Sequence, residues 1–150
     1  MTAKIKYTAP YELKKGHEGD SCFDLCAWFD EDDYNYYSEY PFRLILPGQT
    51  LLIETGVRFD IPEGYEVQIR PRSGQSKDGI LAHFGTIDSG YTGEVAVIIT
   101  NLNGIPVSIR QGDRVAQAFI GKVPDILLDK IDKITKVTER GENGFGSTGK

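Results

Sequence analysis

Short runs of β-branched and aromatic residues, separated by turn sequences, recur along most of this chain and constrain its fold more than any other feature. In one run, Tyr65, Val67 and Ile69 alternate with polar residues, which predicts a strand with one buried and one solvent-facing side. Residues 95–100 are almost entirely apolar and indicate a central strand. Many short strands, with turns about every 8–12 residues, are typical of an antiparallel sandwich or barrel.

Strands are expected over residues 5–8, 42–46, 50–53, 57–61, 65–69, 95–100, 107–110 and 115–120, a short hairpin over 79–84, and a turn or two of helix around 76–81. The sequence shows no domain boundary, internal repeat or heptad pattern, so its 150 residues predict a single all-β domain. This domain is expected to occupy residues 1–139, and a flexible glycine-rich tail follows over 140–150.

Composition limits the classes of ligand. Hydrophobic residues make up 39% and charged residues 26% of the chain, as in globular proteins. No apolar run reaches the ~20 residues that span a bilayer, and no secretory leader pattern is visible, so a cytoplasmic protein without membrane contact is expected. The net charge is −5 and no basic cluster is present, which argues against nucleic acid but leaves a small anionic ligand open.

Two cysteines, Cys22 and Cys26, lie four residues apart. In a strand their Cα atoms would be ~13 Å apart, beyond disulfide reach, and neither histidine has a spacing that suggests zinc. Buried free thiols are therefore expected.

The acidic, tyrosine-rich segment 30–40 has no clear hydrophobic period. We interpret it as an irregular surface-loop insertion. The alternative is a patch that binds a partner protein.

The tail over 140–150 contains four glycines and has few side chains to bury. By itself it predicts a mobile, solubilising end. Its residue types also suit a nucleotide, because Phe145 can stack on a flat base. Arg140 and the hydroxyls of Ser147 and Thr148 can hold phosphate.

Two internal segments contain residues that could also bind or act on a phosphate-bearing ligand. In RPRSGQS (70–76), the Arg72 guanidinium can fork onto phosphate oxygens, although a Pro/Ser/Gly turn is also common by itself. In GTIDSGYTGE (85–94), Asp88 can act as a general base for water or simply cap its own loop as an Asx-turn. Tyr91 can likewise contact a ligand or cover the core.

Together with SCFDLCA (21–27), GDRVAQAFI (112–120) and RGENGFGSTG (140–149), these two segments resemble the five motifs of the trimeric-type dUTPases, the deoxyuridine 5′-triphosphate nucleotidohydrolases. All five occur in the family order across nearly the whole chain. The resemblance implies a jelly-roll-like, distorted antiparallel barrel or sandwich that assembles as a homotrimer. Its sites would lie between subunits, with the tail of one chain closing over a neighbour's site.

The resemblance also implies roles for individual residues. Asp88 would orient the attacking water and accept a hydrogen bond from the sugar 3′-hydroxyl, while Tyr91 would lie against the deoxyribose and exclude ribonucleotides. Main-chain groups before and around Gly85 would read uracil, and Phe145 would cover the ring. Asp24 would help to hold Mg²⁺, through water. The other implied substrate-binding residues are Arg72, Ser73, Gly74, Thr86, Ile87, Gln117, Arg140, Gly146, Ser147 and Thr148.

The implied reaction is in-line attack of water on the α-phosphorus of dUTP, which gives dUMP and pyrophosphate without a covalent intermediate. In the family this reaction limits uracil incorporation into DNA and supplies dUMP for dTMP synthesis. Two positions depart from the family pattern: Cys22 replaces a usual glycine, and Ala82 stands where many relatives have asparagine.

Two other functions compete with dUTP hydrolysis. The related dCTP deaminases share the fold but place a catalytic glutamate where this chain has Ile98, which cannot transfer a proton. A protein-binding role switched by nucleotide, with segment 30–40 as the partner surface, is compatible with hydrolysis.

Overall fold

The computed structural model describes residues 3–30, 41–146 and 149. Most of the acidic segment 30–40, together with Ser147 and Thr148, lies outside the described residues. The described strands are β1 (Lys6–Thr8), β2 (Cys22–Cys26), β3 (Phe42–Ile45), β4 (Thr50–Asp60), β5 (Tyr65–Arg70), β6 (Ile80–Ala82), β7 (Gly85–Ile87), β8 (Val95–Asn101), β9 (Val107–Arg110) and β10 (Arg114–Lys122), and the helix is α1 (Ser73–Lys77).

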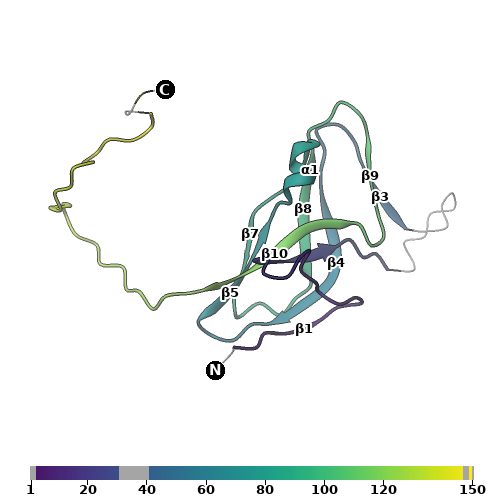
Figure 1. Cartoon of the computed structure of the whole chain (residues 1–150), viewed down its shortest axis with the longest axis horizontal. Coiled ribbons are helices and arrows are strands. Elements are labelled where there is room, and N and C mark those ends of the chain that lie inside the picture. The colour runs from purple at the N-terminus through teal and green to yellow at the C-terminus, as the bar shows by residue number, and fades with distance from the viewer. Residues whose placement is uncertain (1–2, 31–40, 147–148, 150) are drawn as a thin grey trace.

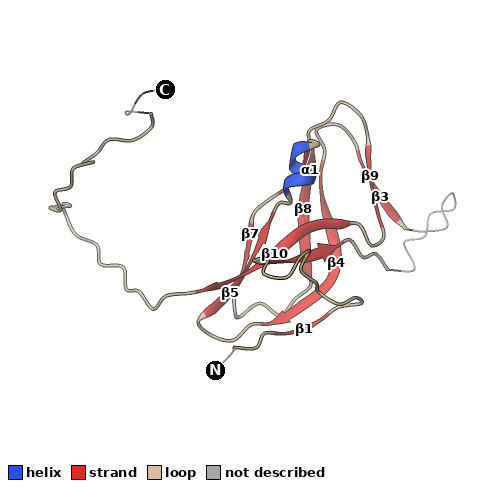
Figure 2. Ribbon diagram, viewed as in Figure 1, coloured by secondary structure: helices blue, strands red, loops and turns tan. Residues whose placement is uncertain are grey.

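The strands form two four-stranded sheets and a two-stranded ribbon (Figures 1 and 2). One sheet has the order β1-β4-β8-β6, the other has the order β2-β10-β5-β7, and β3 pairs with β9. All of these strand pairs are antiparallel. The predicted all-β, single-domain fold is confirmed, and β8 is a central strand as expected.

The core lies between the two four-stranded sheets. Alternate residues on the facing strands are buried, among them Ile53 and Val97 from one sheet and Leu25 and Val67 from the other, each 0% exposed. This arrangement is what an alternating sequence pattern demands, because successive side chains of a strand point to opposite faces. The alternation predicted over 65–69 is therefore present.

The buried side chain of Asn101 holds the end of β8 in place. Its amide nitrogen donates to the carbonyls of Ile45 (2.9 Å) and Ile105 (2.8 Å), and its amide oxygen accepts from the Asn103 N–H (2.8 Å). The contacts to Ile105 and Asn103 brace the turn at 103–104, which the sequence predicts, and the contact to Ile45 ties β8 to β3. A buried amide with these partners avoids the cost of an unpaired polar group.

Strand β4 is continuous from Thr50 to Asp60, whereas the sequence predicts two separate strands. The register with β8 shifts between Glu54 and Val57, so the gap in the pattern is a β-bulge. Gly56 occupies this bulge with φ +68°, and a Cβ there would lie 2.7 Å from Pro10 Cδ. Only glycine suits both the backbone angle and the contact.

Two further sequence predictions are wrong. The helix spans 73–77 and not 76–81, because Ile80–Ala82 is drawn into a strand that pairs with β8. The expected hairpin over 79–84 does not form, since β6 pairs with β8 while β7 pairs with β5. The chain between them crosses from one sheet to the other.

The segment that precedes β2 covers the open edge of that strand. The Tyr11 hydroxyl accepts a hydrogen bond from the Cys26 N–H (2.9 Å) and donates to the Cys26 carbonyl (3.0 Å). Burial raises the pKa of Tyr11 to about 12.

Cys22 and Cys26 are free thiols, as predicted, but both are half-buried rather than buried. Burial also raises the pKa of Cys26.

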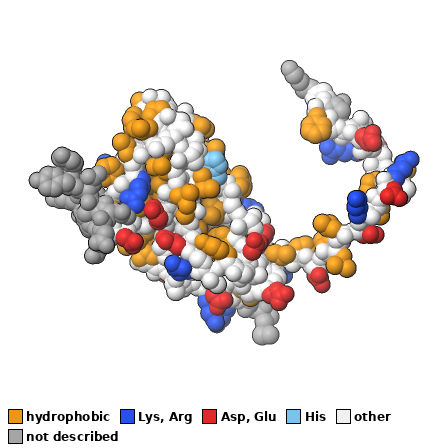
Figure 3. Space-filling view, turned by 180° about the vertical axis from the view of Figure 1, so that it is seen from behind, with side chains coloured by type: hydrophobic (Ala, Val, Ile, Leu, Met, Phe, Trp, Pro, Cys, Tyr) orange, Lys and Arg blue, Asp and Glu red, His pale blue; other side chains and the backbone are white. Residues whose placement is uncertain are grey.

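After β10 the chain leaves the body and runs outward as an arm (Figure 1). Large apolar side chains on this arm are exposed, including Leu127 (92%), Leu128 (97%) and Val137 (94%). Figure 3 shows hydrophobic side chains interspersed with charged ones along it. Among the described residues, no helix has the length and apolar character to cross a membrane.

Candidate active site

One sheet brings four distant segments of the sequence together. Across β2 and β10, Asp24 faces Gln117, and across β10 and β5, Gln117 faces Arg70. On the far side of β5, Gly85 pairs with Ile69. Segments 21–27, 112–120, 70–76 and 85–94 therefore lie on adjacent strands, in that spatial order. The sheet thus provides a rigid frame for the residues that the sequence singles out.

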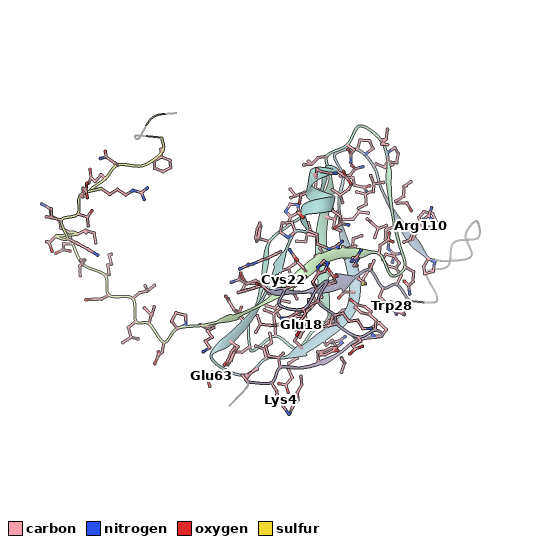
Figure 4. The ribbon with its side chains drawn as sticks, in the orientation of Figure 1. Lys4, Glu18, Cys22, Trp28, Glu63 and Arg110 are labelled. Carbon is pink, nitrogen blue, oxygen red and sulfur yellow. The ribbon has the colours of Figure 1, made fainter. Side chains whose placement is uncertain are left out.

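A hollow of about 510 Å³ opens at one end of this sheet. Cys22, labelled in Figure 4, begins β2 and belongs to this lining. Its lining is more polar than apolar and includes two arginines, which suits an anionic ligand. The lining residues are Gly16, His17, Asp20, Ser21, Cys22, Asp24, Arg72, Ser73, Gly74, Arg114 and Gln117.

Two guanidinium groups converge on one carboxylate inside the hollow. Arg72 Nε lies 3.1 Å from Asp24 Oδ1, and Arg114 Nη1 lies 3.6 Å from Asp24 Oδ2. The Asp24 side chain is 18% exposed, and those of Arg72 and Arg114 are 25% and 57% exposed. Two cations against one anion leave a local excess of positive charge, although the whole chain carries −5. Such a place attracts phosphate oxygens.

One side-chain and one backbone hydrogen bond fix the strand-to-helix turn that carries Arg72. The side-chain nitrogen of Gln117, Nε2, donates to the Pro71 carbonyl at 2.9 Å, which ties β10 to the turn. The Ser76 N–H donates to the Arg72 carbonyl at 3.0 Å, so the helix begins directly after this residue. Ser73 and Gly74 stand at its first positions and border the hollow. Because nothing lies within 4 Å of the place where a Gly74 Cβ would be, a ligand can approach its backbone freely.

The Asp88–Tyr91 segment is a tight turn after β7. The Tyr91 N–H donates to the Asp88 carbonyl at 3.0 Å, and the Tyr91 hydroxyl donates to the Glu94 carbonyl at 2.8 Å. The ring folds over Gly93, where a Cβ would lie 2.5 Å from Tyr91 Oη. Tyr91 is 49% exposed, so it does not fill the core, and Asp88 is exposed to solvent. This carboxylate and this ring are therefore available to a ligand.

Gly85, Thr86 and Ile87 form β7 itself. A Cβ on Gly85 would lie 3.4 Å from Ile69 Cδ1, so glycine allows close packing against β5. The Ile87 side chain is 6% exposed and belongs to the core. Any ligand contact made by Ile87 must therefore use its main chain, as the sequence predicts for this region.

The structure does not bring all predicted residues together in one chain. Ile87, next to Asp88, pairs with Val67, while Arg72 lies five residues beyond Val67. β5 ends at Arg70, and its three steps from Val67 to Arg70, at 3.3 Å per residue, put roughly 10 Å of strand between the two groups. The hollow that contains Arg72 and the Asp88–Tyr91 turn are thus toward opposite ends of the β5–β7 ladder.

The tail residues lie away from both the hollow around Arg72 and the Asp88–Tyr91 turn. In the described residues, Arg140 Nε donates to the Asn143 carbonyl at 3.0 Å, within the tail itself. Phe145 is fully exposed, at 115%, and has a φ of 50°. Gly146 adopts φ 87°, and the tail stands clear of the body of its own chain (Figure 1).

Asp24 is the residue that the sequence predicts as a metal contact. No group of three or more histidine, cysteine, aspartate or glutamate side chains among the described residues is arranged to hold a metal ion. Mg²⁺ rarely needs such a cage, because it keeps several waters and binds through one or two carboxylates plus substrate phosphates. Asp24 is a single, partly exposed carboxylate in a hollow that also contains two arginines suited to phosphate, and this fits that mode of binding.

Sequence reasoning missed Arg114 as a member of the site. The residue lies in the GDRVAQAFI segment, three positions before Gln117. A β-bulge separates the two, because the β2–β10 register shifts between Arg114 and Ala116. Arg114 belongs to one of the five motifs, which could have identified it. Strand alternation alone, however, would place the Arg114 side chain on the opposite face from Gln117.

Comparison with known proteins points to one family. The family model described as dUTPase matches residues 12–149. A deoxyuridine 5′-triphosphate nucleotidohydrolase of Wolbachia pipientis subsp. Culex pipiens is 43% identical over 145 residues, which is 93% of this chain and 95% of that protein. A dUTPase of Staphylococcus bacteriophage 80alpha, solved with dUpNHpp, superimposes with a TM-score of 0.82 at 23% identity, covering 99% of each chain.

A mutant dUTPase from phage phi11 of S. aureus, in which a structural Mg(II) ion is coordinated, superimposes with a TM-score of 0.71 at 20% identity, over 87% of this chain and 98% of that chain. At such identities, the two phage structures support the fold alone.

Proposed function

The chain belongs to the dUTPase family, and from that premise we propose that it hydrolyses dUTP to dUMP and pyrophosphate. The observation that carries the proposal is the hollow in which Arg72 and Arg114 converge beside Gln117. A triphosphate needs several fixed donors, and guanidinium groups are well suited to bind its oxygens. Limiting uracil incorporation into DNA and supplying dUMP for dTMP synthesis would follow from this reaction.

The phosphate chain would lie against the turn that contains Arg72, Ser73 and Gly74, with Gln117 on the adjacent strand. Negative charge builds up on the phosphate oxygens as water attacks the α-phosphorus. Donors that are already in position stabilise this charge without reorganising during the reaction. The contact between Gln117 and Pro71 keeps the turn in position and thereby orients these donors.

Asp88 and Tyr91 would act on the nucleoside end. The exposed Asp88 carboxylate can accept a proton from the attacking water and hold that water in line with the phosphorus. The Tyr91 ring is fixed by its hydrogen bond to Glu94 and offers a flat surface to the sugar. A ribose 2′-hydroxyl would collide with this surface, so the site would prefer deoxyribose.

Mg²⁺ is the proposed cofactor, and Asp24 would hold it through water. When bound, the ion would offset charge on the phosphates and restrict their conformations. All other elements of the mechanism belong to the protein: arginines that hold the phosphates, a carboxylate that positions water, and a ring that selects the sugar.

We further propose a homotrimer in which neighbouring chains complete each site. Two observations support this. Asp88 and Arg72 of one chain lie toward opposite ends of the β5–β7 ladder. The arm after β10 also exposes Leu127, Leu128 and Val137, apolar surface that a neighbouring subunit would bury.

The tail over 140–150 would close over a site as a lid. Phe145 is exposed and can stack on uracil, and Arg140, whose Nε donates to the Asn143 carbonyl, has further N–H groups that can bind the terminal phosphate. Glycines on both sides of Phe145 let the backbone adopt the conformation that closure demands. Ordering the lid costs conformational entropy, which stacking and phosphate contacts must offset.

The proposal is tested by pyrophosphate release from each of the four DNA nucleotides, dUTP and UTP, with and without Mg²⁺. We expect rapid release from dUTP with Mg²⁺ and little from the others. Ammonia release from dCTP would instead indicate a deaminase. Equal release from all of these nucleotides would contradict a uracil- and deoxyribose-specific site.

A further inference from the structure

The Asp24 carboxylate occupies two of the donors that the proposed phosphate site requires. Arg72 Nε and Arg114 Nη1 face its two oxygens, at 3.1 Å and 3.6 Å. The two arginines are also linked to each other, because Arg72 Nη1 lies 3.5 Å from the Arg114 carbonyl. The three side chains thus form one connected group in the wall of the hollow.

This arrangement places Asp24 in competition with any bound polyphosphate. The carboxylate is only 18% exposed, so water screens its attraction for the guanidinium groups less than it would at the surface. Phosphate oxygens that enter the hollow seek the same N–H groups. Each donor that turns to phosphate leaves Asp24 with less of the positive charge that stabilises it.

We propose that Asp24 is an internal competitor for the phosphate-binding arginines and releases them when a polyphosphate and a divalent cation bind together. The inference rests on the proposed function, and it gives Asp24 a positioning role in addition to its proposed contact with hydrated Mg²⁺. In the free protein, Asp24 holds Arg72 and Arg114 in the hollow. In the complex, it exchanges these two partners for the hydrated cation.

Such an exchange couples the two ligands. A cation that takes over Asp24 frees the arginines, and a polyphosphate that takes over the arginines frees Asp24. Each ligand therefore raises the affinity for the other by the same factor, because linkage is reciprocal. A carboxylate that served only as a metal contact would lower phosphate affinity in the absence of the cation only through its charge, as any carboxylate in the hollow would. A control carboxylate that does not pair with the arginines therefore separates the two roles.

The test uses Asp24→Asn, which keeps the shape of the side chain and removes its charge. Binding of the non-hydrolysable analogue α,β-imido-dUTP is measured by calorimetry, first with EDTA and then with Mg²⁺. We expect the variant to bind the analogue roughly three- to tenfold more tightly than the parent protein in EDTA, as expected for loss of a partly buried charge contact. The gain in affinity that Mg²⁺ gives the parent protein should largely disappear.

Asp20→Asn is the matched control. Asp20 borders the same hollow, but its carboxylate accepts from the His17 N–H at 2.7 Å and does not pair with either arginine. The control removes the same charge from the same hollow and should leave EDTA affinity near that of the parent protein. An equal increase in both variants would attribute the effect to overall charge and overturn the inference. Unchanged or weaker EDTA binding by Asp24→Asn would also overturn it.

Arg114→Gln keeps the inference testable if Asp24→Asn does not fold. Removing Arg114 leaves Asp24 with one fewer partner to exchange, so the Mg²⁺-dependent gain in analogue affinity should fall, and an undiminished gain would contradict the exchange. Deoxyuridine serves as a ligand without phosphate, and its affinity should not change in any variant. If the parent protein binds neither deoxyuridine nor the analogue, the proposed function fails; if it binds both and the variants behave alike, only the exchange fails.

Discussion

Asp88 and Arg72 lie at opposite ends of the β5–β7 ladder, because Ile87 pairs with Val67 and Arg72 lies five residues further along the chain. A water-positioning carboxylate and a phosphate-binding arginine must reach the same substrate. Within one chain, the length of this ladder separates the two groups. This separation favours a site completed between subunits.

Replacing Asp88 with asparagine should stop turnover without stopping binding. The amide keeps the size of the side chain but cannot take a proton from water, so kcat should fall by about 10²–10⁴-fold or more. Calorimetry should still detect dUTP binding. Asp60→Asn, which alters an exposed carboxylate paired with Lys6, is the control and should remain fully active. Near-normal turnover by Asp88→Asn would remove this residue from the mechanism.

Truncation after Glu139 should cripple hydrolysis and leave the fold intact. In the described part of the tail, the side chain of Arg140 bonds only within the tail and Phe145 is fully exposed, so the body loses no packing. Steady-state kinetics should show a large loss in kcat/KM, while the thermal unfolding midpoint stays within a few degrees of that of the full chain. Full activity in the truncated protein would contradict a catalytic lid.

Gly93→Ala should weaken sugar selection by displacing the Tyr91 ring. A Cβ at this position would lie 2.5 Å from Tyr91 Oη and 2.6 Å from Cζ, so the ring must move. We expect the ratio of kcat/KM for dUTP over UTP to fall by roughly tenfold. Gly90→Ala is the control, since nothing lies within 4 Å of its Cβ position. Unchanged selectivity in Gly93→Ala would show that Tyr91 does not read the sugar.

Tyr11→Phe should destabilise the protein and flatten its response to alkali. The substitution removes both hydrogen bonds to Cys26, for an expected loss of about 1–3 kcal/mol at neutral pH. Burial raises the pKa of Tyr11 from 10.0 to about 12, so the folded chain keeps a proton that the unfolded chain loses first. That stabilisation is complete below pH 10 and is lost as the pH rises toward 12.

Urea unfolding at fixed protein concentration, at pH 7 and at several values between 10 and 12, measures both effects. The parent protein should lose stability more steeply than the phenylalanine variant over the alkaline range. Parallel curves for the two proteins would show that the Tyr11 proton is not coupled to folding.

Much of the fold follows from local sequence. The alternation at Val67 and Ile69 and the turn at 103–104 predict strands and connections that the structure contains. The helix and the 79–84 segment were misplaced because Ile80–Ala82 pairs with β8, a contact between residues far apart in sequence. The break expected in β4 is a bulge around Gly56, which periodicity reads as a strand end.

The site was less accessible to sequence reasoning. The motifs name Asp24, Arg72 and Gln117, and sheet order brings these three together. Arg114 was overlooked because its place in the hollow depends on the register shift before Ala116. The separation of Asp88 from Arg72 depends on strand pairing, which residue spacing alone does not reveal.

The most direct test of a site shared between subunits mixes Asp88→Asn chains with chains that end at Glu139. Neither protein alone should hydrolyse dUTP at an appreciable rate. If Asp88 and the lid of each site come from different chains, random assembly from equal amounts leaves about one quarter of the sites with both intact. We therefore expect pyrophosphate release at about a quarter of the rate of the parent protein after co-refolding. A mixture as inactive as its two components would contradict the account.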